Sequence, residues 1–166
     1  HLSPAFARIK SKGGEIMRYY PAFICENGHA VETTSLYCNS RFCSTCGARV
    51  ISQCPHCETP IQGHEYGSSG YYQIPKYCTG CGKPYPWITA AVEGTTHLIR
   101  ESEMDENTQR KLIEILPDVI SETPKTQLAA FRIQKAMTSC SKFLAEGLRQ
   151  FAIDFGCELL KQKLGL

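Results

Sequence analysis

Eight of the ten cysteines and three of the five histidines lie in one stretch, residues 25–87. Thiolates and imidazoles at close, paired spacing are the usual ligands of structural zinc, which binds four of them tetrahedrally. Three Cys-x-x-Cys pairs and one looser pair with histidine supply eight such ligands: Cys43/Cys46, Cys54/Cys57, Cys78/Cys81 and Cys25/His29. The stretch therefore predicts two structural Zn²⁺ ions, each held by four side chains.

The spacing alone does not show which of these ligand pairs share an ion. Joining Cys43/Cys46 to Cys54/Cys57 would leave only seven residues for the hairpin between them. Two pairs are instead followed by glycine, Gly47 and Gly82, which tolerates the positive φ of a metal-binding turn. We therefore expect an interleaved order, as in treble-clef and cross-brace folds. The first site would be Cys43, Cys46, Cys78 and Cys81, and the second Cys25, His29, Cys54 and Cys57, with Cys38 as the alternative to His29.

The elements that must position these ligands are poor in leucine, isoleucine and valine. Such a segment does not offset its ordering entropy by apolar burial alone, so a cross-link is needed. The Cys-x-x-Cys spacing and the absence of a signal-like apolar run favour metal over disulfides, and hence the cytoplasm. Iron is the chemical alternative, and the histidine in one site favours zinc. No run approaches the ~20 apolar residues of a membrane span.

The chain divides by composition into three parts, and the fold class expected is α+β. Residues 1–16 are an N-terminal arm, either added ahead of a natural start at Met17 or native and flexible. Residues 17–87 form a small double zinc-ribbon or treble-clef-like module, with strands expected over 18–24 and 71–74. Residues 88–166 form an α-helical domain.

The helical domain shows start and stop signals. We expect a helix over 89–101, a second capped by Asp105 and either bent or restarted at Pro117, and a third starting at Thr123-Pro124. A break is expected near Ser139 and Ser141. The last segment carries an apolar stripe that predicts core packing, with a weak homodimer as the alternative to a monomer: Leu144, Leu148, Phe151, Phe155 and Leu159.

Charge bears on the class of partner. Residues 1–22 carry four basic and one acidic group, residues 23–87 carry four of each, and residues 88–166 carry ten basic and eleven acidic. Nucleic-acid binding rests on a basic face, so the balanced module makes this partner a second choice.

No catalytic arrangement is evident. Two closed metal sites leave no open position for a substrate, and the zinc-deaminase signature is absent. We therefore expect a non-catalytic adaptor or scaffold that binds a protein partner, with Tyr66, Tyr71, Tyr72, Tyr85 and Trp87 as candidate anchors. The alternative is that these aromatic side chains cover the small metal core, which we favour for Trp87. The alternatives are a nucleic-acid-binding zinc ribbon and a RING-like ligase component, the latter suggested only by the interleaved ligand order.

A resemblance to a known family rests on a series of short motifs. They are Cys25-x-Asn27-Gly28-His29, Phe42-Cys43-x-x-Cys46-Gly47-Ala48, Cys54-Pro55-x-Cys57, and Tyr77-Cys78-x-x-Cys81-Gly82-Lys83-Pro84-Tyr85-Pro86-Trp87. The series resembles a bacterial zinc-ribbon family known only as a domain of unknown function, from about Met17 to the C-terminus. The resemblance implies that His29, and not Cys38, is a ligand. It implies no activity.

Overall fold

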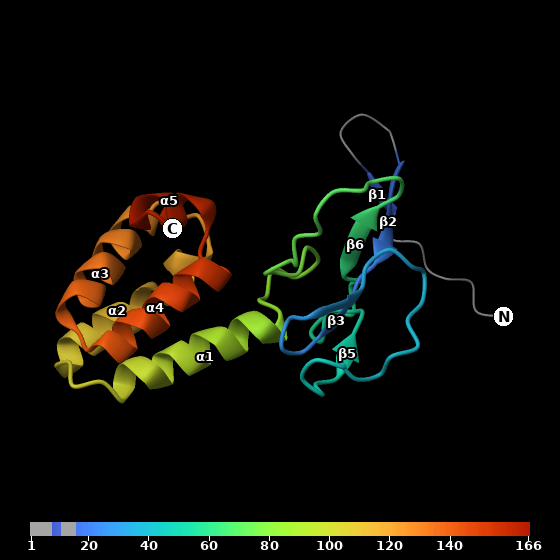
Figure 1. Ribbon diagram of the computed structural model, residues 1–166. Coiled ribbons are helices and arrows are strands. Elements are labelled where there is room, and N and C mark those ends of the chain that lie inside the picture. Colours follow the sequence, from blue (N-terminus) through green and yellow to red (C-terminus); the bar gives the residue numbers. More distant parts are fainter. Residues whose placement is uncertain (1–7, 11–15) are drawn as a thin grey trace. The chain divides into compact units, whose positions relative to one another are not determined.

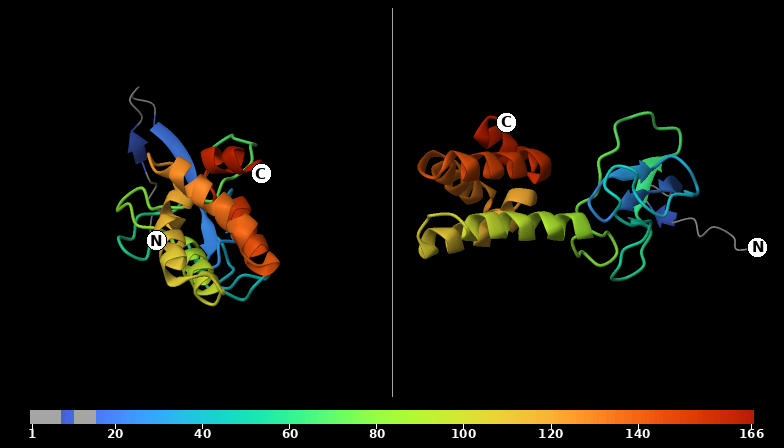
Figure 2. Two further views of the ribbon diagram at one scale, coloured as in Figure 1. Left: turned by 90° about the vertical axis from the view of Figure 1, so that its left-hand side faces the viewer. Right: turned by 60° about the horizontal axis from the view of Figure 1, so that its bottom comes forward.

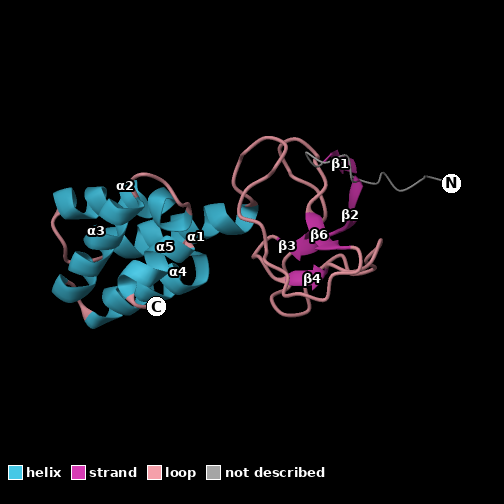
Figure 3. Ribbon diagram, turned by 90° about the horizontal axis from the view of Figure 1, so that it is seen from above, coloured by secondary structure: helices cyan, strands magenta, loops and turns pink. Residues whose placement is uncertain are grey.

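The computed structural model describes residues 8–10 and 16–166, and the side chains from residue 19 onward. The chain forms two compact units that divide between Ile88 and Thr89. The first unit holds the strands and the second the helices (Figures 1 and 3), so the expected α+β class is confirmed. No helix of the described residues has the length and apolar character needed to cross a lipid bilayer.

The first unit contains two three-stranded antiparallel sheets. One has the order β1-β2-β6, from β1 (Arg8–Lys10), β2 (Ile16–Pro21) and β6 (Gln62–Glu65). The other has the order β4-β3-β5, from β4 (Ala30–Glu32), β3 (Phe23–Cys25) and β5 (Val50–Ile51). β1 thus lies inside the expected arm, whose residues 1–7 and 11–15 fall outside the described part of the chain.

Ala22 joins the two sheets. It lies between β2 and β3, is fully buried, and its N–H donates to the carbonyl of Ile61 at 2.8 Å. The small apolar core of this unit lies beneath it and includes Ile24, Ile51 and Ile61.

The segment from Tyr71 to Ile74 is not a strand, contrary to the expectation. It is held by side chains instead. The Tyr72 hydroxyl donates to the Gln62 carbonyl at 2.6 Å, and the Trp87 indole N–H donates to the Pro75 carbonyl at 3.0 Å. Gly70 before this segment and Pro75 after it are both unfavourable in the interior of a strand, and Pro75 has no N–H to donate to a ladder.

The second unit is a bundle built from the remainder of α1 (Pro86–Arg100) and four further helices (Figures 1 and 2). These are α2 (Glu106–Ile120), α3 (Thr126–Ser139), α4 (Lys142–Phe155) and α5 (Glu158–Leu164). The break expected near Ser139 is confirmed: α3 ends there, and Ser141 caps α4 by accepting from the Leu144 N–H at 3.3 Å.

Two boundaries differ from expectation. α2 runs through Pro117 and ends only three residues later, so the missing N–H is confined to its last turn. α3 begins at Thr126, with Lys125 as its N-cap, because the Thr123 hydroxyl accepts from the Lys125 N–H in a turn before the helix.

The apolar stripe of the last segment packs in the core, as expected. Leu144, Leu148 and Phe151 of α4 are buried, and α4 contacts α2, α3 and α5. Helix α4 ends before Gly156 and α5 starts in a new direction of periodicity, so Leu160 of α5 is fully buried in place of Leu159.

Candidate metal centres

The eight predicted ligands come together in two groups of four. The first cluster is Cys25, His29, Cys43 and Cys46, and the second cluster is Cys54, Cys57, Cys78 and Cys81. In each, one ligand atom from every residue lies within 4.8 Å of all the others. The choice of ligand residues is thus consistent with the structure, while the interleaved pairing is wrong.

Strand pairing explains the observed grouping. β3 ends at Cys25 and pairs antiparallel with β5, with Cys25 opposite Val50. The Cys43/Cys46 turn leads directly into β5, because an isolated bridge joins Phe42 to Arg49. The β3–β5 pairing therefore places the first two ligand pairs side by side. The remaining pairs, on either side of the loop through Tyr72, then meet each other.

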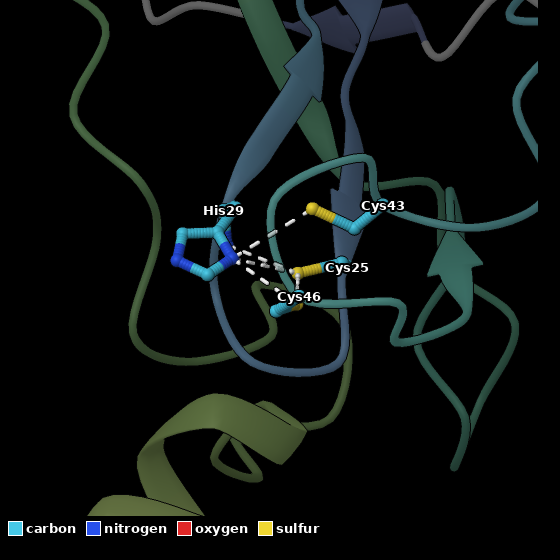
Figure 4. A group of neighbouring side chains, drawn as sticks. All are labelled: Cys25, His29, Cys43 and Cys46. Carbon is cyan, nitrogen blue, oxygen red and sulfur yellow. Dashed lines mark hydrogen bonds between the residues drawn. The ribbon is translucent and has the colours of Figure 1, made fainter.

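The geometry of the first cluster fits a tetrahedral ion (Figure 4). The Nδ1 atom of His29 lies 3.3 Å from the sulfur of Cys46, 3.5 Å from that of Cys25 and 3.7 Å from that of Cys43. The sulfurs of Cys25 and Cys46 are 3.7 Å apart. Zn–S bonds of about 2.3 Å in a tetrahedron require sulfurs about 3.8 Å apart.

The second cluster has the same dimensions with four sulfurs. Cys54 and Cys81 are 3.7 Å apart, and Cys57 and Cys78 are 3.5 Å apart. A disulfide would require about 2.05 Å, and all ten cysteines are free. Four thiols at tetrahedral spacing are the donor set of a structural metal site, so both clusters fit a metal ion such as zinc.

The three Cys-x-x-Cys turns repeat one backbone pattern. In each, the first cysteine N–H donates to a carbonyl five residues on, and a later N–H returns to the first cysteine carbonyl. The returning N–H belongs to Gly47, Glu58 and Gly82 respectively, at 2.8, 2.9 and 2.8 Å. All three residues have positive φ, of 72°, 59° and 72°. Glu58 thus adopts the left-handed conformation that glycine adopts in the other two turns.

Backbone N–H groups aimed at sulfur stabilise the thiolate of the first cysteine in the turns of Cys43 and Cys78. The Thr45 N–H is the largest of the influences that lower the pKa of Cys43 to about 6. Burial raises the pKa of Cys78, but the N–H groups of Cys81 and Gly80, together with hydrogen bonds to the thiols of Cys57 and Cys54, outweigh it and bring this pKa to about 6 as well. A thiolate is the form that binds metal, so these turns are preorganised for an ion.

Other ligands keep their protons more tightly. Burial raises the pKa of Cys25. The Lys83 N–H lowers the pKa of Cys81, but burial and the neighbouring cysteines outweigh it and raise this pKa to about 11. The hydrogen bond to Cys46 raises the pKa of His29. Each cluster thus shares protons among its ligands, and a bound cation would replace them.

Two polar side chains support the sulfurs and were not identified as site residues from the sequence. The Asn27 amide donates to the sulfur of Cys46 at 3.4 Å. The Thr59 hydroxyl lies 3.2 Å from the sulfur of Cys57 and lowers the pKa of that thiol. Their positions in the sequence could have indicated this role, because Asn27 lies inside the Cys25/His29 turn and Thr59 follows Cys57 by two residues.

Tyr85 and Trp87 pack between the clusters and do not form an exposed anchor. They are 2% and 4% exposed, and their rings stack with centroids 4.7 Å apart. Tyr85 hydrogen-bonds Cys78 of the second cluster, while the Trp87 side chain covers Gly28 in the turn of the first cluster. A Cβ atom on Gly28 would lie 3.0 Å from the Cβ of Trp87.

The other candidate ligands lie outside the clusters. The Cys38 thiol is 3.9 Å from the Ser40 carbonyl, and His29 occupies the position for which it was the alternative. His56 is exposed within its turn. His64 lies between the Thr33 hydroxyl and the Gly70 carbonyl, at 2.9 and 3.0 Å, and so ties a loop to β6.

Comparison with known proteins places the chain in a family. No curated protein and no solved structure matches it significantly. A family model described as "Uncharacterized protein conserved in bacteria (DUF2321)" matches residues 18–164, which span both units and both clusters. The chain therefore belongs to this uncharacterised bacterial family.

Proposed function

We propose that the first unit is a zinc-stabilised module that binds a protein partner and carries no catalytic activity of its own. Two clusters with four soft ligands each support a structural role for the ions, because such sites leave no position for substrate. Zinc is the metal that best suits three thiolates with one imidazole, and four thiolates.

One observation carries the proposal of a protein partner: the loop before the first Cys-x-x-Cys turn exposes large apolar side chains. Leu36, Tyr37 and Phe42 are 40%, 73% and 62% exposed, and they lie within seven residues of one another. Exposed aromatic side chains are typical anchors of protein interfaces. Of the five aromatic residues suggested by the sequence, only Tyr71 is as exposed, at 97%.

The metal would shape this loop. Phe42 directly precedes Cys43 and is bridged to Arg49 across the turn. Loss of the first ion would free the turn and with it the end of the loop. Binding of the partner should therefore depend on zinc.

The RING-like alternative loses its basis, because the observed ligand order is sequential and not interleaved. Nucleic-acid binding gains no support from the balanced charge of residues 23–87.

Site-directed photo-crosslinking in the native bacterial host tests the proposal. A photoreactive amino acid at Tyr37 should yield one predominant protein adduct, and the same probe at Thr79, exposed in the third turn, should not. The Tyr37 adduct should disappear in a Cys43→Ser variant that still folds its helices. Equal adducts at both positions, or a nucleic-acid adduct at Tyr37, would refute the proposal.

A further inference from the structure

The helical unit has a groove between α2 and α3 that the proposed function does not use. Its volume is about 330 Å³. Leu112 and Ala136 are buried in its lining, and Phe131 stands at its edge with 62% of its surface exposed. The groove therefore offers an apolar floor with an aromatic wall.

Three cations surround this apolar surface. Lys111 of α2 and Arg132 and Lys135 of α3 line the groove, and no acidic side chain of the described residues lines it. Arg132 reaches across to the Lys111 carbonyl at 3.5 Å, which leaves most of its donors free. Within the part of the chain that the structure describes, none of the three cations pairs with a carboxylate.

The concentration of positive charge is local. The region 88–166 as a whole carries one more acidic than basic group. A long polyanion such as nucleic acid would meet this net negative charge beyond the groove, and its binding requires an extended basic face. A short segment would meet the three cations, the hydroxyls of Thr108 and Ser139, and the apolar floor.

We propose that the α2–α3 groove binds an acidic protein segment that inserts one large apolar side chain against Phe131 and Leu112. Carboxylates on either side of that side chain would pair with Lys111, Arg132 and Lys135. Such charge pairing sets the register and specificity of a segment, and apolar burial supplies much of the affinity. This surface lies on the second unit and is independent of the module proposed above.

Selection of a random phage-displayed peptide library on the full zinc-loaded chain tests this inference. We expect the selected peptides to carry aspartate or glutamate on both sides of a leucine, isoleucine or aromatic residue. The tightest peptide, labelled with a fluorophore, is then titrated against the chain and its variants by fluorescence anisotropy.

Two exposed positions supply variants with matched controls. Lys135→Glu should weaken peptide binding at least tenfold, as should Phe131→Ala, and added salt should weaken it further. Lys142→Glu and Phe143→Ala, both on α4 outside the groove lining, should leave it unchanged. Far-UV circular dichroism checks that all four remain folded.

Several outcomes would overturn the inference. They are a selection that yields no acidic peptide, an affinity that Lys135→Glu leaves unchanged, and an oligonucleotide that displaces the peptide from the groove. A fourth is light scattering that shows a dimer lost in Phe131→Ala, because the groove would then hold a second copy of the chain.

Discussion

At the scale of single residues, the backbone conformation of the three Cys-x-x-Cys turns matters as much as the sulfurs. Each turn requires one residue with positive φ, and two turns use glycine while the third uses Glu58. A left-handed conformation costs an L-residue about 1–2 kcal/mol, and glycine avoids this cost. The turns can therefore be weakened or strengthened without any change of ligand.

Gly47 provides the cleanest test, because a Cβ atom there would meet no neighbour within 4 Å. Gly47→Ala should lower the free energy of unfolding of the zinc-loaded first unit by roughly 1 kcal/mol. Glu58→Gly should be neutral or slightly stabilising. Gly94→Ala in helix α1, also in open space, should stabilise by about 0.5–1 kcal/mol. Chemical denaturation measures all three, and a Gly47→Ala variant as stable as the parent would contradict the prediction.

Gly28 combines two constraints, a φ of 87° and contact with Trp87. Gly28→Ala should therefore displace the Cys25/His29 turn and weaken the affinity of the first cluster for zinc. Gly47→Ala is the matched control, because Gly47 lies in the other turn of the same cluster and has a φ of 72° but open space around it. Competition with a chromogenic chelator reports affinity at each cluster, and equal effects of the two substitutions would show that contact with Trp87 is unimportant.

At the scale of elements, the helices depend on polar groups at their ends. The turn between α2 and α3 is organised by Thr126, which is fully buried. Its hydroxyl accepts from the Thr123 N–H at 2.8 Å and lies 3.2 Å from the Ser121 carbonyl. The start of α2 is held by Asp105, whose carboxylate accepts from the N–H and the hydroxyl of Thr108 at 3.0 and 2.6 Å.

Thr126→Val keeps the shape of the side chain but leaves the Thr123 N–H without a partner. We expect it to destabilise the helical unit by about 1 kcal/mol, the low end of the cost of an unsatisfied donor, because Thr123 is only half-buried. Thr126→Ser retains the hydroxyl and should cost less. Thermal unfolding followed by far-UV circular dichroism distinguishes the variants, and a valine variant that is no less stable than the serine variant would disprove this role.

The hydrogen bonds from Thr108 lower the pKa of Asp105 below its ordinary value of 3.8. Because the pKa is lower in the folded state, the carboxylate stabilises α2 at neutral pH. This contribution is lost as the pH falls through the folded-state pKa. Asp105→Asn should therefore make helix stability less sensitive to acid, as measured by urea denaturation at a series of pH values. Identical pH profiles for parent and variant would contradict this.

At the scale of the whole molecule, the two units are stabilised differently. The first unit has a small core around Ile24, Ile51 and Ile61, beside two clusters of potential ligands. The second unit has an extended apolar core, including Leu116, Ile133 and Leu148. We therefore expect the first unit to need metal in order to fold, and the second unit to fold without it.

Elemental analysis should find two zinc ions per chain. Trp87 is the single tryptophan and is 4% exposed in the first unit. A strong chelator should therefore shift its fluorescence emission from that of a buried indole to that of a solvent-exposed one. The far-UV helical signal should persist. Retention of the tryptophan signal after complete metal removal, or loss of both signals together, would refute the difference between the units.

Local patterns were sufficient to identify the eight residues that gather in the two clusters, the α+β order and most helix boundaries. Cys-x-x-Cys spacing, capping residues and apolar periodicity act over a few residues, so the sequence alone determines them. The strand expected over 71–74 was wrong because side-chain hydrogen bonds of Tyr72 and Trp87 organise that segment instead.

Only the tertiary structure decided which candidate ligands gather in the same cluster and which aromatic side chains remain exposed. Both depend on contacts between residues far apart in the chain, above all the pairing of β3 with β5 and the packing of Trp87 on Gly28. Ligand pairs with equivalent local spacing do not reveal their partners. The burial of Tyr85 and the exposure of Phe42 likewise follow from the fold and not from residue type.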